Sequence, residues 1–200
     1  MTRVFIALDL SDDVRAALRR ELRRLGSALP GVRGEDPANL HLTLAFLGEL
    51  DDDALVATIT LADEVASQTA TFHLALGGLG FFGPPTAPRV IWAGVAGETR
   101  SLFALQRRLA DTLAERGFPR EQRPYSPHLT LARLKRPLDE GAYQRLRAVL
   151  DAPTRQRARW QVDDLRVMRS ERTSEGSRYT ALSIARLVGA APRGKPRPDR

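Results

Sequence analysis

The pentapeptide HLTLA occurs twice in this chain of 200 residues, at 41–45 and again at 128–132. A second pair of similar segments, RVFIA at 3–7 and RVIWA at 89–93, is separated by 86 residues, against 87 for the pentapeptide. Two nearly equal offsets across four segments indicate two similar lobes related by pseudo-two-fold symmetry. Because no Gly- or Ser-rich linker separates the halves, we expect the two lobes to pack together around one cleft.

Apolar runs bounded by Gly, Pro and acidic residues predict a mixture of strands and helices. The expected strands are 3–9, 40–48, 72–82, 89–95, 128–134, 158–171 and 177–187. The expected helices are 12–25, 51–68, 98–116 and 138–150. This order predicts an α+β fold with two mostly antiparallel sheets lining a central cleft and helices outside. The meander 72–95 is expected to have its counterpart in 159–186.

Composition limits the class of protein further. No cysteine is present, so disulfides, cysteine metal centres and thiol nucleophiles are excluded. No apolar run is long enough to span a membrane, and the N-terminal segment lacks the features of a signal peptide. We expect a cytoplasmic, monomeric protein with one bilobal domain over 1–188. The Pro- and Arg-rich segment 189–200 is expected to be a disordered tail.

The chain is basic, with 31 Lys and Arg residues against 24 Asp and Glu and a formal charge of +7 at pH 7. Lys135 and Lys195 are the only lysines. A basic protein favours polyanionic partners such as nucleic acid. A genome that prefers arginine would produce the same excess, so the charge alone leaves both explanations open.

Alternation along a strand places His41 and Thr43 on one face and the leucines of the motif on the other. His128 and Thr130 are arranged in the same way in the second copy. A duplicated packing motif would explain the leucines, but Val or Ile would suit a strand better than His and Thr. We therefore expect each lobe to contribute one imidazole and one hydroxyl to a shared cleft.

Two imidazoles that titrate near neutrality suit a general acid and a general base. Threonine hydroxyls can donate hydrogen bonds to a phosphate, and Arg133, five residues after His128, could bind its oxygens in a fork. Phe46 stands at the matching place in the first lobe. Neither motif contains Asp or Glu, and the acidic run 51–53 is typical of a helix N-terminus, so we expect no metal site.

The segments NLHLTLAFLGEL, PYSPHLTLARL and RVFIALDL resemble the 2H phosphoesterase superfamily. They are most similar to its LigT-like RNA 2',3'-cyclic phosphodiesterase branch, whose members are also called 2'-5' RNA ligases. The resemblance extends to about residue 188, and its paired His-x-Thr motifs are specific. It implies opening of 2',3'-cyclic phosphates to 2'-phosphomonoesters, without metal or cofactor, in a cleft between two lobes.

The resemblance also implies roles for individual residues. His41 would be the acid that protonates the 3' oxygen, and His128 the base that activates water. Thr43, Thr130 and Arg133 would hold the phosphate. The partner would be RNA with a 2',3'-cyclic phosphate end or a cyclic nucleotide, and the alternatives are 2'-5' RNA ligation and binding of RNA ends without turnover.

Other side chains have simpler explanations. Tyr125, in a Pro-flanked loop, could stack on a base or pack within its loop. His73 has no hydroxyl partner and is expected to be a structural or surface residue. Phe5 and Trp92 are expected in the core. The glycines in 77–80 lack the strand-to-helix context of a phosphate loop and indicate a bulged strand.

Overall fold

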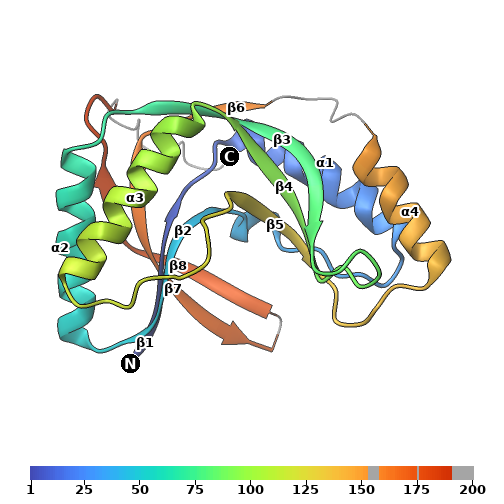
Figure 1. Cartoon of the computed structure of the whole chain (residues 1–200), viewed down its shortest axis with the longest axis horizontal. Helices are drawn as coiled ribbons and strands as arrows, with labels where there is room; N and C mark the ends of the chain where they lie inside the picture. Colours follow the sequence, from blue (N-terminus) through green and yellow to red (C-terminus); the bar gives the residue numbers. More distant parts are fainter. Residues whose placement is uncertain (153–157, 175, 191–200) are drawn as a thin grey trace, which may run out of the picture.

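The computed structural model describes residues 1–152, 158–174 and 176–190 (Figure 1). The strands in these ranges are β1 (Thr2–Leu8), β2 (Leu42–Leu50), β3 (Phe72–Phe82), β4 (Val90–Gly97), β5 (His128–Arg133), β6 (Arg159–Val162), β7 (Asp164–Thr173) and β8 (Gly176–Arg186). The helices are α1 (Asp12–Ala28), α2 (Asp52–Ser67), α3 (Thr99–Glu115), α4 (Glu140–Asp151) and the short 3-10 helix η1 (Pro37–Asn39).

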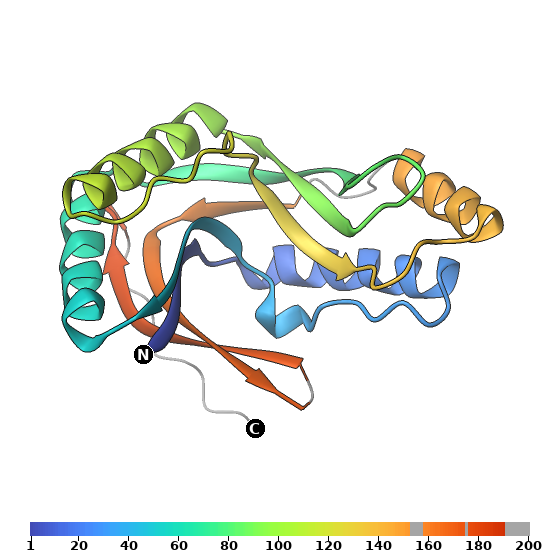
Figure 2. The ribbon, with the colours of Figure 1, turned by 60° about the horizontal axis from the view of Figure 1, so that its bottom comes forward.

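The strands form two four-stranded antiparallel sheets, as predicted. Sheet A has the order β2-β1-β7-β8, and sheet B has the order β5-β4-β3-β6. The two HLTLA segments therefore occupy the same edge position in each sheet. These two edge strands, β2 and β5, also contact each other near the centre of the molecule (Figure 2).

Strand pairing gives the symmetry a slightly different register from the one expected. Ala7 pairs with Thr43 in sheet A, whereas Trp92 pairs with Thr130 in sheet B. Trp92 therefore takes the place of Ala7, and β1 and β4 are offset by 85 residues rather than 86. The alignment of RVFIA with RVIWA was wrong by one residue because it matched side-chain types, whereas hydrogen-bond pairing sets the structural register.

The expected single strand 158–171 is two strands in two sheets. β6 pairs with β3 in sheet B, and β7 pairs with β1 in sheet A, so the chain crosses between the sheets at Asp163. Alternate burial slips by one residue at this point. The buried apolar side chains are Trp160 and Val162 before it and Leu165 and Val167 after it.

The same crossing makes the expected equivalence of 72–95 and 159–186 wrong. β4 corresponds to β1, and both pair with a long central strand, β3 in one sheet and β7 in the other. The hairpin β7–β8 instead joins a central strand to an edge strand. The bulge predicted from the glycines of β3 is present, as a register shift between Leu76 and Leu79.

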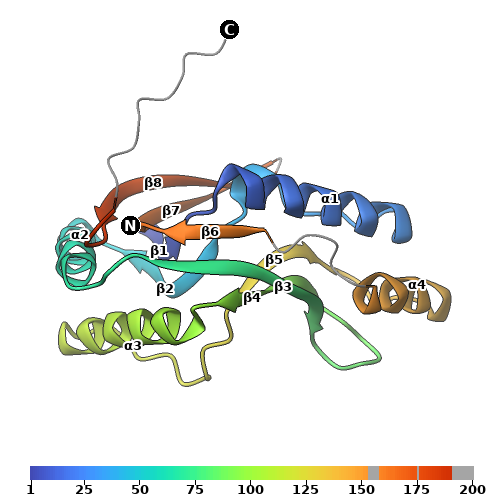
Figure 3. The ribbon, with the colours of Figure 1, turned by 90° about the horizontal axis from the view of Figure 1, so that it is seen from above.

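The helices do not stay with the strands that precede them. α1 follows β1 of sheet A but packs against α4 and β6, while α3 follows β4 of sheet B but packs against α2 and β2. The helices therefore form two pairs at opposite ends of the molecule (Figure 3). One continuous cluster of buried apolar side chains runs through both halves, so the two lobes are interlocked.

Helix starts follow the acidic segments. The side chains of Ser11, Asp51 and Asp139 each accept a hydrogen bond from the amide three residues later, which confirms 51–53 as a helix N-terminus. Within the described ranges no helix is both long enough and apolar enough to cross a membrane. The domain boundary at 188 stays a prediction, and residues 191–200 of the expected tail 189–200 lie outside the described residues.

Candidate active site

The two motif histidines are held in the same way. Nδ1 of His41 lies 2.6 Å from the carbonyl oxygen of Asn39, and Nδ1 of His128 lies 2.8 Å from that of Ser126. Each acceptor is the carbonyl two residues earlier in the chain. A carbonyl can only accept, so the neutral ring carries its proton on Nδ1 and leaves Nε2 for a substrate.

Aromatic rings pack against both imidazoles. The centroid of Phe5 lies 4.6 Å from that of His41, and Tyr179 meets the same ring edge-on at 5.1 Å. Phe82 meets His128 edge-on at 4.8 Å. These contacts restrict the rotation of both rings. From the sequence, alternation along β1 could have predicted that Phe5 faces the cleft. Tyr179 and Phe82 lie on distant strands, and no local sequence feature predicts that their rings contact the histidines.

Phe5 is buried as predicted, yet its ring lies against a catalytic candidate. Trp92 is only half-buried and packs on Phe82, which in turn contacts His128. The Trp92 ring lies directly over Gly80, where an added Cβ would be 2.4 Å from two ring atoms. Gly80 is therefore needed for the packing behind His128.

Arg15 of α1 fixes the turn that precedes His41. Its Nη1 donates to the carbonyl oxygens of Pro37 and Leu40, each at 3.0 Å, and more distantly to that of Ala38, while Nη2 binds Asp9. The same turn provides the carbonyl that orients His41. Sequence reasoning missed Arg15, because nothing local distinguishes it from the other arginines of α1.

The pKa of His41 is lowered from its ordinary value, mainly because burial disfavours the charged imidazolium. The bond to the Asn39 carbonyl and the charge of Asp9 oppose this shift, whereas Arg15 and Arg133 add to it. The arginine of the second motif therefore acts electrostatically on the histidine of the first.

Arg133 is exposed at the end of β5, and its Nε lies 3.5 Å from Oε1 of Glu35. The segment containing Glu35 runs along the edge of β5. The Glu35 amide donates to the carbonyl of Leu131 at 2.7 Å, and Gly34 forms a bridge with Ala132. The loop after α1 thus positions the arginine of the second lobe.

Tyr125 joins the two motifs. Its hydroxyl donates to the carbonyl oxygen of Thr43 at 3.0 Å, across the boundary between the lobes. Burial raises the pKa of this hydroxyl, so it stays protonated as a donor. Since Tyr125 lies three residues before His128 and Thr43 two residues after His41, this bond brings both motifs to one site. Its stacking on a base stays a prediction.

The two threonines are half-buried, and neither hydroxyl hydrogen-bonds to another described side chain or carbonyl. A pocket of about 200 Å³ beside His41 is also lined by Arg166 and Tyr179.

His73 is exposed, 3.5 Å from a Glu98 carboxylate oxygen, as expected of a surface residue. No three His, Cys, Asp or Glu side chains gather as a metal-binding group within 1–152, 158–174 and 176–190.

Two His-x-Thr strands on adjoining edges of two pseudo-symmetric sheets define the 2H phosphoesterase class. A family model described as the 2'-5' RNA ligase superfamily matches residues 11–174. The chain belongs to this superfamily.

Known proteins similar to the chain agree with this assignment. A protein of Archaeoglobus fulgidus named RNA 2',3'-cyclic phosphodiesterase is 33% identical over 91% of this chain and 98% of its own length. One of the same name from Geobacillus stearothermophilus is 37% identical over 64% of this chain, but only 41% of its own length is covered.

Solved structures show the same fold. The crystal structure of TT0787 of Thermus thermophilus matches with a TM-score of 0.79 and 30% identity, over 94% of this chain and all of that one. E. coli LigT complexed with 3'-AMP matches with a TM-score of 0.70 and 26% identity, over 94% and 98% of the two chains.

Proposed function

We propose that this chain is an RNA 2',3'-cyclic phosphodiesterase that opens the cyclic phosphate to a 2'-phosphomonoester without a metal ion. The observation that carries the proposal is the pair of equivalent histidines, each with Nδ1 bound to a carbonyl and Nε2 left for chemistry. The names of the Archaeoglobus and Geobacillus relatives support the substrate class. A basic chain also suits a polyanionic substrate.

In this mechanism Nε2 of His128 takes a proton from water as the water oxygen bonds to phosphorus. Nε2 of His41 gives a proton to the 3' oxygen as its bond to phosphorus breaks. The product is a 2'-phosphate beside a free 3'-hydroxyl, and the two histidines have exchanged protonation states. Thr43, Thr130 and Arg133 stabilise the negative charge that builds on the phosphorane oxygens.

The lowered pKa of His41 constrains this assignment, because an acid must begin the reaction protonated. Burial favours the neutral ring in the free enzyme. A bound phosphodiester brings a negative charge next to the imidazole and favours the charged form. Substrate binding would therefore raise the pKa of His41 and prepare it as the acid.

The test compares chelator-treated enzyme, with and without added divalent ions, on a nucleoside 2',3'-cyclic phosphate and on RNA with the same end. We expect equal rates and a 2'-phosphate product. His41→Ala and His128→Ala should both abolish turnover of these substrates, while the surface control His73→Ala should not. Restoration of a chelated enzyme by one divalent ion, or normal turnover by either motif variant, would contradict the proposal.

A substrate with a nitrophenolate leaving group separates the roles of the two histidines. This group leaves without a proton, so His41→Ala should retain much of its activity and His128→Ala should not. The opposite pattern would exchange the roles. Adding RNA with a 5'-hydroxyl tests the ligase alternative, because that hydroxyl can replace water in the same step and form a 2'-5' bond.

A further inference from the structure

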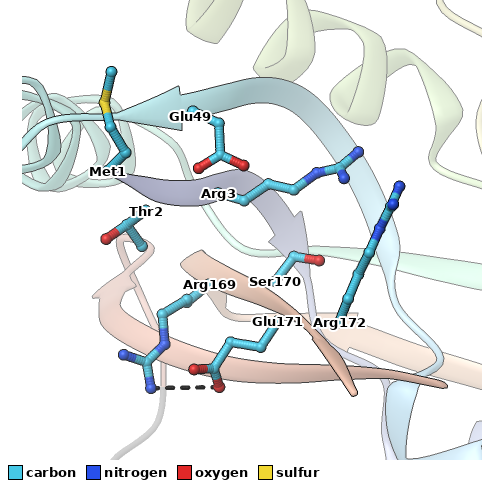
Figure 4. Close-up of a pocket in the computed structure, with 8 residues that line it drawn as sticks. All are labelled: Met1, Thr2, Arg3, Glu49, Arg169, Ser170, Glu171 and Arg172. Atoms are coloured by element: carbon cyan, nitrogen blue, oxygen red, sulfur yellow. Dashed lines mark ion pairs between the residues drawn. The ribbon is translucent and has the colours of Figure 1, made fainter. Parts of the chain in front are cut away.

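A notch of about 480 Å³ lies on sheet A, where the start of β1 and the hairpin β7–β8 diverge (Figure 4). Arg3, Ser170 and Arg172 line it together with Glu49. The guanidinium groups of Arg3 and Arg172 point to the same side, and Ser170 lies next to the lower part of the Arg172 side chain. Two cations and a hydroxyl donor at one surface form a candidate anion site.

The notch is separate from the pocket beside His41, but residues that contact the His41 ring lie next to the notch on β1 and β8. Arg3 lies two residues from Phe5 on the same face of β1, about 7 Å along the strand, and Phe5 packs on the His41 ring. Ser170 pairs with Tyr179, which also contacts His41. This distance of about 7 Å along the strand is comparable to the spacing of successive phosphates in an extended single strand of RNA.

The charges in the notch are available for a ligand. No hydrogen bond or ion pair to another described residue engages Arg172, which is exposed. The neighbouring Arg169 and Glu171 pair with each other at 3.6 Å and point to the opposite side (Figure 4). Glu49 and Glu171 are the acidic side chains that line the notch, and Glu171 is paired with Arg169 and Arg178.

Pseudo-symmetry gives a second, independent argument for Arg3. Phe46 pairs with Phe5 just as Arg133 pairs with Val90, so Phe46 occupies the first-lobe position equivalent to Arg133. The Arg3 guanidinium lies 5.0 Å from the centroid of the Phe46 ring. The first-lobe position equivalent to Arg133 is therefore apolar, and a cation from β1 lies against its ring.

We propose that Arg3, Ser170 and Arg172 bind a backbone phosphate of a nucleotide upstream of the cyclic end. The enzyme then acts preferentially on RNA ends rather than on cyclic mononucleotides. This proposal rests on the proposed function, since the cyclic end must occupy the site at His41. Glu49 weakens the subsite, because its charge repels the phosphate.

The first test measures kcat/KM for a nucleoside 2',3'-cyclic phosphate and for a tetranucleotide that ends in the same group. The wild type should prefer the tetranucleotide. Arg3→Met and Arg172→Met should each lower kcat/KM on the tetranucleotide about tenfold, with the mononucleotide rate unchanged, and Glu49→Gln should raise it. Arg178→Met is the matched control, because Arg178 lies on the same hairpin but pairs with Glu171.

The second test needs no turnover. Fluorescence anisotropy gives the Kd of a tetranucleotide with a 2'-phosphate end at several salt concentrations, and each variant should reduce the slope of log Kd against log salt by about 0.7. If the variants are active but their salt slopes equal that of the wild type, the subsite is overturned. Equal losses of kcat/KM on the mononucleotide and the tetranucleotide would overturn it as well. If binding depends on Arg3 and Arg172 but the protein has no turnover, the proposed function is overturned and the subsite stands. Arg172→Met changes an exposed residue, so its folding is not in question.

Discussion

Replacing Arg15 tests whether the turn before His41 must be held for catalysis. In Arg15→Met the hydrogen bonds to the carbonyls of Pro37, Ala38 and Leu40 and the ion pair with Asp9 are lost. Asp9 keeps Arg166 at 2.7 Å, so no unpaired carboxylate is left behind. The cost should therefore fall below that of breaking an isolated buried pair, at about 2–3 kcal/mol of unfolding free energy.

That loss corresponds to a fall in Tm of roughly 5–10 °C for a domain of this size. Activity should fall further, because a displacement of about 1 Å at a catalytic group can reduce the rate about a hundredfold. The loss should appear mainly in kcat, since Arg15 reaches the reaction through the position of His41. Arg19→Met, on an exposed face of the same helix, is the matched control.

The pH profile separates positioning from simple destabilisation. Arg15 adds to the lowering of the His41 pKa that burial causes, so its removal should raise that pKa. The alkaline limb of kcat/KM should then move to higher pH in Arg15→Met and stay in place in Arg15→Lys. Lysine keeps the charge, but its compact ammonium lacks the branched guanidinium that reaches the carbonyls and Asp9 together, so the rate should not recover. Wild-type kcat with an unmoved limb would refute the positioning role.

Three further predictions concern the same site. In the wild type, the alkaline limb of the kcat profile should lie at higher pH than that of kcat/KM, because bound phosphate raises the pKa of His41; coincident limbs would contradict this. Tyr125→Phe should lower the unfolding free energy by about 1 kcal/mol in chemical denaturation and reduce kcat, and Tyr143→Phe should do neither. Gly80→Ala should lower the unfolding free energy by about 1–3 kcal/mol and reduce activity, because the new Cβ meets the Trp92 ring. Gly78→Ala should be neutral, because a Cβ added there has no atom within 4 Å. Equal stability of the two glycine variants would disprove the packing argument.

The repeat predicted the two-sheet α+β fold and the equivalent placement of its motifs, because strand periodicity and acidic helix starts are local signals. It could not predict that α1 packs against α4, since the apolar face of an amphipathic helix does not specify which helix or sheet it packs against. The strand 158–171 failed for a related reason. Its apolar residues suit any sheet, and only the one-residue slip at Asp163 marks the change of sheet.

The motif residues could be found because two identical copies stand out against the chain. Arg15 and Tyr179 could not, because their roles depend on contacts with distant segments. Tyr179 touches the ring of His41, which lies far earlier in the sequence. Such residues can be identified only from the folded structure, in which the distant segments come together. Arg15 and Tyr179 are the residues that orient the first histidine.

The crossing at Asp163 also sets an order of events during synthesis. β1 is made before both HLTLA segments, yet its partner β7 is made only after them, and Val4 pairs with Arg169. Such distant pairings close slowly, because a long loop must be ordered first. A nascent chain would hold both histidines long before the hairpin β7–β8 arrives to place Tyr179 against His41. Competence for chemistry would then be acquired only after β8 has been made and has paired with β7.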